Sequence, residues 1–250
     1  MPHAAPPWQE SAFLKACRGE PVKRTPIWLM RQIGRYDPAF RKFRAKVPFL
    51  KFCKSPGPVA QWTVRTVEKL DVDAAIVFSD ILLPLEPLGV GLSYVKGEGP
   101  RIARPVATPQ DLKRLKAFEV KERLAYVYEA IAASRKALDP GIPLLGFAGA
   151  PFTLASYLIE GGGSRDCART KAFMHRHPEA WHRLLARLSL QTAAHLNAQI
   201  AAGAQAVQVF DSWVGTLGPT DYRQYVLPHT FGVFARLPKE VPAIHFGTHT

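Results

Sequence analysis

The sequence alternates short apolar runs with longer segments of helical periodicity, and this alternation limits the fold more than any other feature. Each run is rich in β-branched or large apolar residues and is short enough for one strand. Strands that alternate with helices are typical of βα units on a parallel sheet. Five such runs are predicted as strands, at residues 26–29, 73–78, 143–148, 206–210 and 242–246.

Local signals mark the helices between these runs. Ser-Pro at 55–56 and Thr-Pro at 108–109 each place an N-cap residue before proline at the first helical position. A longer helix is predicted at 178–202, because its apolar residues recur at i, i+3, i+4 and i+7 and Gly203 suits the C-terminal cap. Pro228 lies inside a further helical pattern, so a kink or break is predicted there.

Two architectures fit five strands of this kind. The chain has 250 residues, of which 47% are hydrophobic, and we expect residues 1–250 to form a single domain. The runs can be the first five βα units of a (β/α)₈ TIM barrel, or they can complete a five-stranded doubly wound sheet. Ligands bind at the C-terminal ends of the strands in both, so the residues that follow each run are the candidates for chemistry.

The charge balance indicates an anionic partner. Lys and Arg number 33 against 20 Asp and Glu, which gives a formal net charge of +13. No zinc finger, helix-turn-helix or interleaving of aromatic and basic residues supports nucleic-acid binding. The uncharged stretches 141–159 and 188–210 contain proline, glycine or polar residues and are interpreted as buried elements, not membrane spans. The predicted partner is therefore an acidic small molecule, with no nucleic acid and no membrane.

The cysteines favour a reducing compartment. Cys17, Cys53 and Cys167 are odd in number and far apart, with no Cys-x-x-Cys or His-x-Cys spacing. We therefore expect no metal site, no disulfide framework and a cytoplasmic location. The first ten residues have neither a basic start nor an apolar run, so they are predicted to be a loose arm and not a signal peptide.

Basic residues follow the first run. Arg31 and Arg35 stand four apart with Gly34 between them. Guanidinium groups bind carboxylates in a bidentate manner, so the pair can form a double clamp for an acidic ligand. A solvated basic turn is the alternative interpretation.

A single carboxylate follows the second run. Asp80 lies within the apolar segment 78–84. A buried, unpaired carboxylate is costly, so Asp80 requires a cation or several N–H donors. The alternatives to a catalytic role are a helix N-cap and an internal ion pair with Arg31 or Arg35.

The segments after the later runs give weaker signals. The third run leads into a helix that carries Tyr157 and ends at a triple glycine, Gly161-Gly162-Gly163, which no Lys-Ser or Lys-Thr follows. A helix stop, with Ser164 as the cap of the next helix, is the favoured interpretation. Ser212 after the fourth run can donate to a ligand or act as a cap. His245 after the fifth is interpreted as structural.

Together these segments resemble the uroporphyrinogen decarboxylase family of the haem pathway. The likeness extends from about residue 10 to residue 247, in the family's order and spacing. The matching stretches are 26–36 (PIWLMRQIGRY), 78–82 (FSDIL), 97–100 (GEGP), 149–154 (GAPFTL), 160–164 (EGGGS) and 210–213 (FDSW).

The resemblance implies a (β/α)₈ barrel, usually a homodimer, that decarboxylates the four acetate side chains of uroporphyrinogen III to give coproporphyrinogen III without a cofactor. It implies Asp80 as the residue that faces the pyrrole nitrogens, with Arg31 and Tyr157 as further catalytic candidates. The substrate contacts that it implies are Arg31, Gln32, Arg35, Asp80, Tyr157 and Ser212.

Physical chemistry is consistent with those roles. A pyrrole protonated at a ring carbon becomes cationic and accepts the electron pair that departing carbon dioxide leaves. A carboxylate 4 Å away stabilises that cation by roughly 4 kcal/mol at an effective dielectric constant of 20. Arginine held on the reacting acetate would stabilise a charge that must disappear, so Arg31 and Arg35 are expected to hold non-reacting arms. The proton donor is left open between Arg31, Tyr157 and a bound water.

The end of the chain and the remaining alternatives complete the interpretation. Members of the family continue for three more strands and carry a later substrate-binding histidine, a role that we assign neither to His245 nor to His249. We expect a C-terminally truncated barrel that folds poorly and is inactive alone.

The competing hypotheses are a corrinoid-linked methyltransferase of the same superfamily, a non-catalytic fragment and a nucleic-acid binder. The scattered cysteines argue against the methyltransferase, because it requires thiol and imidazole ligands for zinc.

Overall fold

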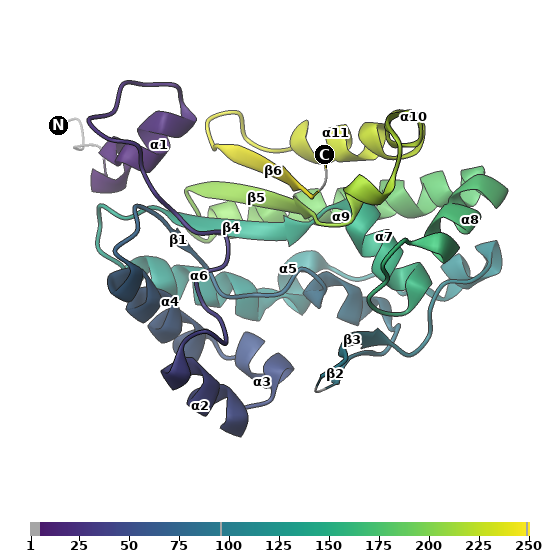
Figure 1. Ribbon diagram of the computed structural model, residues 1–250, viewed down its shortest axis with the longest axis horizontal. Helices are drawn as coiled ribbons and strands as arrows, with labels where there is room; N and C mark the ends of the chain where they lie inside the picture. Colours follow the sequence, from purple (N-terminus) through teal and green to yellow (C-terminus); the bar gives the residue numbers. More distant parts are fainter. Residues whose placement is uncertain (1–5, 96, 249) are drawn as a thin grey trace.

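The main sheet has four parallel strands that are hydrogen-bonded in chain order (Figure 1). The computed structural model describes residues 6–95, 97–248 and 250. The strands are β1 (Ala75–Ile76), β4 (Leu144–Gly149), β5 (Ala206–Asp211) and β6 (Ala243–Gly247). Four of the five predicted strands are therefore confirmed.

Helices and one hairpin connect these strands. The α-helices are α1 (Ala12–Cys17), α2 (Pro38–Lys46), α3 (Phe49–Cys53), α4 (Pro56–Leu70), α5 (Val120–Arg123), α6 (Ala125–Ala137), α7 (Pro151–Glu160), α8 (Ala168–Arg176), α9 (Pro178–Ala201), α10 (Pro219–Asp221) and α11 (Leu227–Phe234). The 3₁₀ helices are η1 (Pro7–Glu10), η2 (Leu83–Leu88), η3 (Pro109–Arg114) and η4 (Val214–Thr216), and η5 (Tyr222–Val226) is a π-helix. The antiparallel hairpin consists of β2 (Leu92–Val95) and β3 (Gly99–Ile102).

The strand order distinguishes the two predicted architectures. A doubly wound sheet reverses its strand order at a switch point, whereas the units of a barrel follow one another in one direction. Here β1, β4, β5 and β6 are neighbours in chain order. Helices α6 and α9 pack on β4, α4 packs on α6 and α11 packs on α9. The arrangement is that of (β/α)₈ barrel units, and in the described part of the chain the sheet is open, since β1 pairs only with β4 and β6 only with β5.

The strand predicted at 26–29 is wrong, for an identifiable reason. This segment runs beside the residues that lead into β1, but a single backbone hydrogen bond between the described residues, from Asp73 N to Ile27 O (2.7 Å), joins the two. The buried amide of Gln32 takes the place of a ladder, because its Nε2 donates to Ala74 O (2.7 Å) and its Oε1 accepts from Ile76 N (3.2 Å). Proline at position 26 also removes one backbone donor.

The core lies on both faces of the sheet. Buried apolar residues of β4, β5, α9 and α11 pack together on the face that the long helices cover. On the opposite face, Phe13 and Leu14 of α1 pack against Ile76, Leu145 and Ala206 of the strands. Helix α1 lies at the end of the sheet where the strands begin (Figure 1).

The loose arm predicted for residues 1–10 is wrong for its second half. Residues 7–10 form η1, and Trp8 packs against the buried cluster that contains Phe13 and Leu14. The Ser11 side chain accepts a capping hydrogen bond from Leu14 N (3.3 Å) at the start of α1. Residues 1–5 lie outside the described part of the chain.

The predicted helix boundaries are confirmed, although one cap works differently. Helices α4 and η3 begin at Pro56 and Pro109, and α9 ends just before Gly203. The Ser55 hydroxyl donates to Lys51 O (2.6 Å) and does not cap α4. The break predicted near Pro228 is the change from η5 to α11.

Replacing Gln32 by alanine is expected to lower the free energy of unfolding by about 2 kcal/mol or more, because Ala74 O and Ile76 N would be left buried and unpaired. Urea denaturation followed by circular dichroism measures the change. Gln61 is exposed on α4, so Gln61→Ala is the matched control and is expected to stay within about 0.5 kcal/mol of wild type. Equal stability of the two variants would contradict the conclusion that the two hydrogen bonds of the Gln32 amide hold this segment to the sheet.

Candidate functional site

The candidate site lies at the carboxyl end of the sheet. Asp80 follows β1, Tyr157 lies on the helix that follows β4, and Ser212 follows β5. Because the strands are parallel, these three segments reach the same edge, and α7 leads away from it (Figure 1). The topology therefore brings together residues that the sequence places far apart.

The Asp80 carboxylate is the central acidic group of this edge. Its Oδ1 accepts a hydrogen bond from Leu82 N (2.8 Å) in the turn before η2. Burial raises the pKa of Asp80, and the nearby Tyr94 hydroxyl and Leu82 amide oppose that rise. In the described part of the chain Asp80 forms no salt bridge with Arg31 or Arg35, so the internal ion pair named as an alternative is absent. The alternative of a helix N-cap is wrong as well, because the N-cap residue of η2 is Leu82 and the bond from Leu82 N to Asp80 is a turn contact.

Two tyrosine hydroxyls belong to the surroundings of Asp80. Burial raises the pKa of Tyr157 to about 12, and the charges of Asp80 and Cys167 add to the effect. Burial and Asp80 also raise the pKa of Tyr94, on the β2–β3 hairpin. Both hydroxyls are therefore protonated at neutral pH and can donate hydrogen bonds. Sequence reasoning missed Tyr94, although it lies three residues before the motif 97–100.

The ring of Tyr157 is held by Trp213. The two ring centroids are 4.2 Å apart and the planes are inclined by 31°. Such a contact fixes the direction of the phenol more firmly than burial alone. Trp213 was part of a motif in the sequence, but no role was predicted for it.

The residues of the predicted clamp differ in their surroundings. Arg31 and Arg35 are exposed, and their guanidinium groups form no salt bridge within the described residues. Gln32, between them, is buried with its amide bonded to the backbone of β1 on both sides. The two arginines can therefore take an anionic ligand, whereas Gln32 would have to release a backbone bond to do so.

The other candidates are arranged as follows. Ser212 is half-buried, and its carbonyl oxygen accepts from the Thr248 hydroxyl. Gly161 ends α7 with φ of 83°, and Ser164 Oγ accepts from Cys167 N (3.1 Å) before α8. The triple glycine is thus a helix stop, as predicted, but Ser164 does not cap α8, because the N-cap residue of that helix is Cys167 and the Ser164 hydroxyl binds the amide of Cys167. His249 lies outside the described residues.

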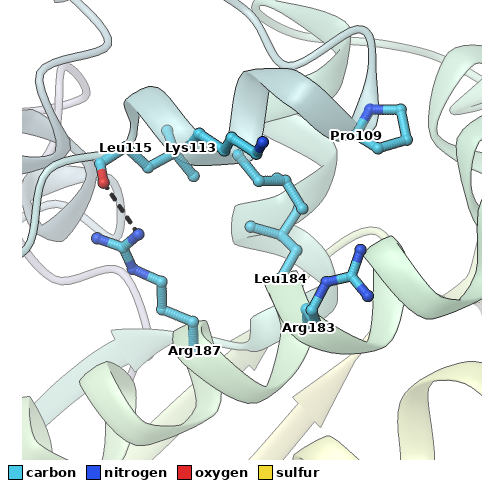
Figure 2. Close-up of a pocket in the computed structure, with 7 residues that line it drawn as sticks. Pro109, Lys113, Leu115, Arg183, Leu184 and Arg187 are labelled. Carbon is cyan, nitrogen blue, oxygen red and sulfur yellow. Dashed lines mark hydrogen bonds between the residues drawn. The ribbon is translucent and has the colours of Figure 1, made fainter.

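Two cavities lie away from this edge. One of about 270 Å³ lies between η3 and α9, where Arg187 donates to Leu115 O (3.0 Å) (Figure 2). Its other basic groups, Lys113 and Arg183, surround an apolar floor of proline and leucine side chains. A second cavity, of about 190 Å³, lies between α9 and α11. Neither is lined by a residue that the sequence predicted for the site.

The cysteines are free and dispersed. Cys53 and Cys167 are buried, while Cys17 is exposed. Among the described residues, no three His, Cys, Asp or Glu side chains come together in a way that could hold a metal ion. No described helix has both the length and the apolar character that a membrane crossing requires.

Comparison with known proteins gives a consistent result. The sequence pattern of the uroporphyrinogen decarboxylase family matches residues 9–250. The chain is 53% identical to the uroporphyrinogen decarboxylase of Carboxydothermus hydrogenoformans over 238 residues, which cover 95% of this chain and 68% of that protein. It is 51% identical to that of Sorangium cellulosum, with the same coverage. A methyltransferase from Methanosarcina mazei has a similar fold, with a TM-score of 0.75 at 20% identity over 94% of this chain and 68% of that one.

Replacing Asp80 by asparagine is expected to raise the free energy of unfolding at pH 7, because burial disfavours the charged carboxylate and Asn keeps the oxygen that accepts from Leu82. A raised pKa in the folded state means that the native protein binds the proton more tightly than the unfolded chain. The difference between variant and wild type should therefore shrink as the pH falls from 7 toward the ordinary aspartate value of 3.8.

Urea denaturation at pH 7 and at pH 4.5 measures this difference. Glu129 is exposed on α6, and Glu129→Gln serves as the control, with no expected change at either pH. A lower stability of the Asp80→Asn variant at pH 7 would contradict the account of its burial.

Proposed function

The chain belongs to the uroporphyrinogen decarboxylase family, and on this premise we propose that it converts uroporphyrinogen III to coproporphyrinogen III by removing the carboxyl groups of the four acetate side chains. Relatives about half identical in sequence support decarboxylation. The net charge of +13 suits a substrate with eight carboxylates. The methyltransferase hypothesis is not favoured, because that likeness, at 20% identity, concerns the fold alone.

The observation that carries the proposal is the Asp80 carboxylate, which lies at the carboxyl edge of the sheet beside two protonated tyrosines and without a salt bridge in the described structure. A carboxylate in this state is available to a cationic group of the ligand. The pyrrole ring becomes such a group when it is protonated at carbon. Asp80 would then lower the energy of the cation that forms as carbon dioxide departs.

The arginines have a different role in the proposal. Arg31 and Arg35 bind acetate or propionate groups that do not react, and they orient the macrocycle over Asp80. Bidentate guanidinium contacts supply this orientation, which brings the reacting ring to the carboxylate. No cofactor is required in the proposal, since the protonated ring itself accepts the electron pair.

The proton donor is chosen from Arg31, Tyr157 and a bound water. A pKa of about 12 makes the Tyr157 hydroxyl a weaker acid than an exposed phenol. Bulk water is a weaker acid still, so acid strength does not select water over Tyr157. In the proposal the Tyr157 hydroxyl at least serves as a hydrogen-bond partner that orients the substrate or a bound water. Ser212 supplies a further substrate contact in this scheme.

The assembly and location follow from the family resemblance and are proposals as well. We propose a homodimer in the cytoplasm, which acts on a small molecule and needs neither nucleic acid nor membrane. Light scattering coupled to size exclusion measures the mass of the assembly. The chain spans about two thirds of the length of the relatives that it matches. The activity measurement therefore has to distinguish an active decarboxylase from an inactive fragment.

Asp80→Asn is expected to lower kcat by roughly 10² to 10³, since removal of one charged group that stabilises a transition state costs about 3–4 kcal/mol. Chromatography of the oxidised porphyrin products measures the rate. Glu129→Gln, on the exposed face of α6, is the control. A rate near that of wild type for Asp80→Asn would remove Asp80 from the mechanism, and a wild-type chain that forms no coproporphyrinogen would remove the proposed activity.

Arg31→Ala and Arg35→Ala are each expected to raise KM by roughly tenfold or more, with a smaller effect on kcat, because they remove binding that ground state and transition state share. Lys42 is exposed on α2, so Lys42→Ala removes the same charge away from the site and should leave KM unchanged. An equal rise of KM in all three variants would assign the effect to overall charge instead of to the clamp.

A further inference from the structure

A second carboxylate, buried at the end of β5, is only half satisfied. Asp211 has no exposed surface. Its Oδ1 accepts a hydrogen bond from Thr153 Oγ1 (2.9 Å), whereas its Oδ2 has no hydrogen-bond partner among the described residues. The His245 Nε2 atom lies 3.6 Å from that oxygen, which is within the range of an ion pair with a protonated imidazole but beyond hydrogen-bond distance. A buried carboxylate in this state is unfavourable for folding, so stability alone does not explain its presence.

The Asp211 carboxylate sets the direction of one hydroxyl group. Thr153 has a single hydroxyl proton, and it donates a hydrogen bond through that proton to Asp211 Oδ1. The lone pairs of Thr153 Oγ1 then accept a hydrogen bond from Trp213 N (3.3 Å). Thr153 lies in the first turn of α7, where the helix dipole favours a negative charge nearby.

These bonds close a ring of contacts around the site. Asp211 binds Thr153, Thr153 binds the backbone of Trp213, and the Trp213 ring packs on Tyr157, which lies four residues after Thr153 on the same helix. The end of β5 and the start of α7 are therefore fixed to each other at two points. Tyr157 can change its direction only if one of these contacts breaks.

We propose that Asp211 is a positioning residue, which acts through Thr153 to hold the Trp213–Tyr157 pair in place beside Asp80. The role rests on the proposed decarboxylation, because only a reaction at Asp80 gives the direction of Tyr157 a consequence. Asp211 itself does not touch the substrate, since it is fully buried. Its effect on the reaction passes through the hydroxyl of Thr153.

Kinetics test the proposal with three variants. Asp211→Asn and Thr153→Val are each expected to lower kcat by roughly 10- to 100-fold with little change in KM, because a small displacement of an orienting group slows the chemical step. Thr153→Ser keeps the hydroxyl and should restore most of the rate. The control is Asp221→Asn, a half-buried aspartate of α10 that contacts His175 and should keep the wild-type rate.

A double-mutant cycle separates positioning from a general structural role. If Asp211 acts through Tyr157, adding Asp211→Asn to the Tyr157→Phe variant should lower kcat by less than about twofold, since the hydroxyl that Asp211 positions is already missing. Additive effects in the cycle would overturn the proposal. A rate near wild type in Asp211→Asn, or in Tyr157→Phe, would overturn it as well.

A spectroscopic arm keeps the proposal testable if the chain shows no decarboxylation, which would contradict the proposed function alone. The near-ultraviolet circular dichroism band that disappears in Trp213→Phe reports the packing of Trp213 on Tyr157. Asp211→Asn and Thr153→Val should lose most of that band while Thr153→Ser keeps it. If Asp211→Asn does not fold, Thr153→Val carries the test, and an unchanged band in Thr153→Val would overturn the proposed ring of contacts.

Discussion

The parallel ladder from β1 through β4 and β5 to β6 is the constraint on which the rest of the structure depends. The residues that follow each strand lie at the same edge, so 77–82, 149–153 and 211–216 meet although up to 139 positions of the chain separate them. Helices on one face hold the ladder by apolar packing. The edge itself carries polar groups, and their charges act on one another because the surroundings exclude much of the water.

Much of this arrangement could be predicted from the sequence, because hydrophobic period and capping signals are local. Four strands, the long helix α9 and the break near Pro228 follow from such signals. The absence of a strand at 26–29 could not be predicted, since an apolar run does not reveal that the Gln32 side chain replaces the backbone hydrogen bonds of a strand pair. Tyr94 was missed for a related reason: its approach to Asp80 depends on how a hairpin folds back, which no spacing in the sequence records.

Two aspartates at the same edge have different surroundings. Asp80 is largely buried, though less completely than Asp211, and it lies near the hydroxyls of Tyr94 and Tyr157. Asp211 is fully buried beside the start of α7, where it accepts a hydrogen bond from the Thr153 hydroxyl and contacts no solvent. In our proposals the aspartates that follow β1 and end β5, the two strands on either side of β4, divide between chemistry and support, and the complete burial of Asp211 separates the two.

The two hydrogen bonds that the Gln32 side chain forms with the sheet have a mechanical consequence for the segment that carries Arg31 and Arg35. A strand inside the sheet is released only when a row of backbone bonds breaks together, as between β4 and β5. Here one amide side chain and a few bonds near Asp73 hold the segment. Local opening therefore requires less free energy than separation of the inner strands. The two guanidinium groups can adapt their spacing while the sheet beneath them stays rigid, which suits the bulky polyanion that we propose as the substrate.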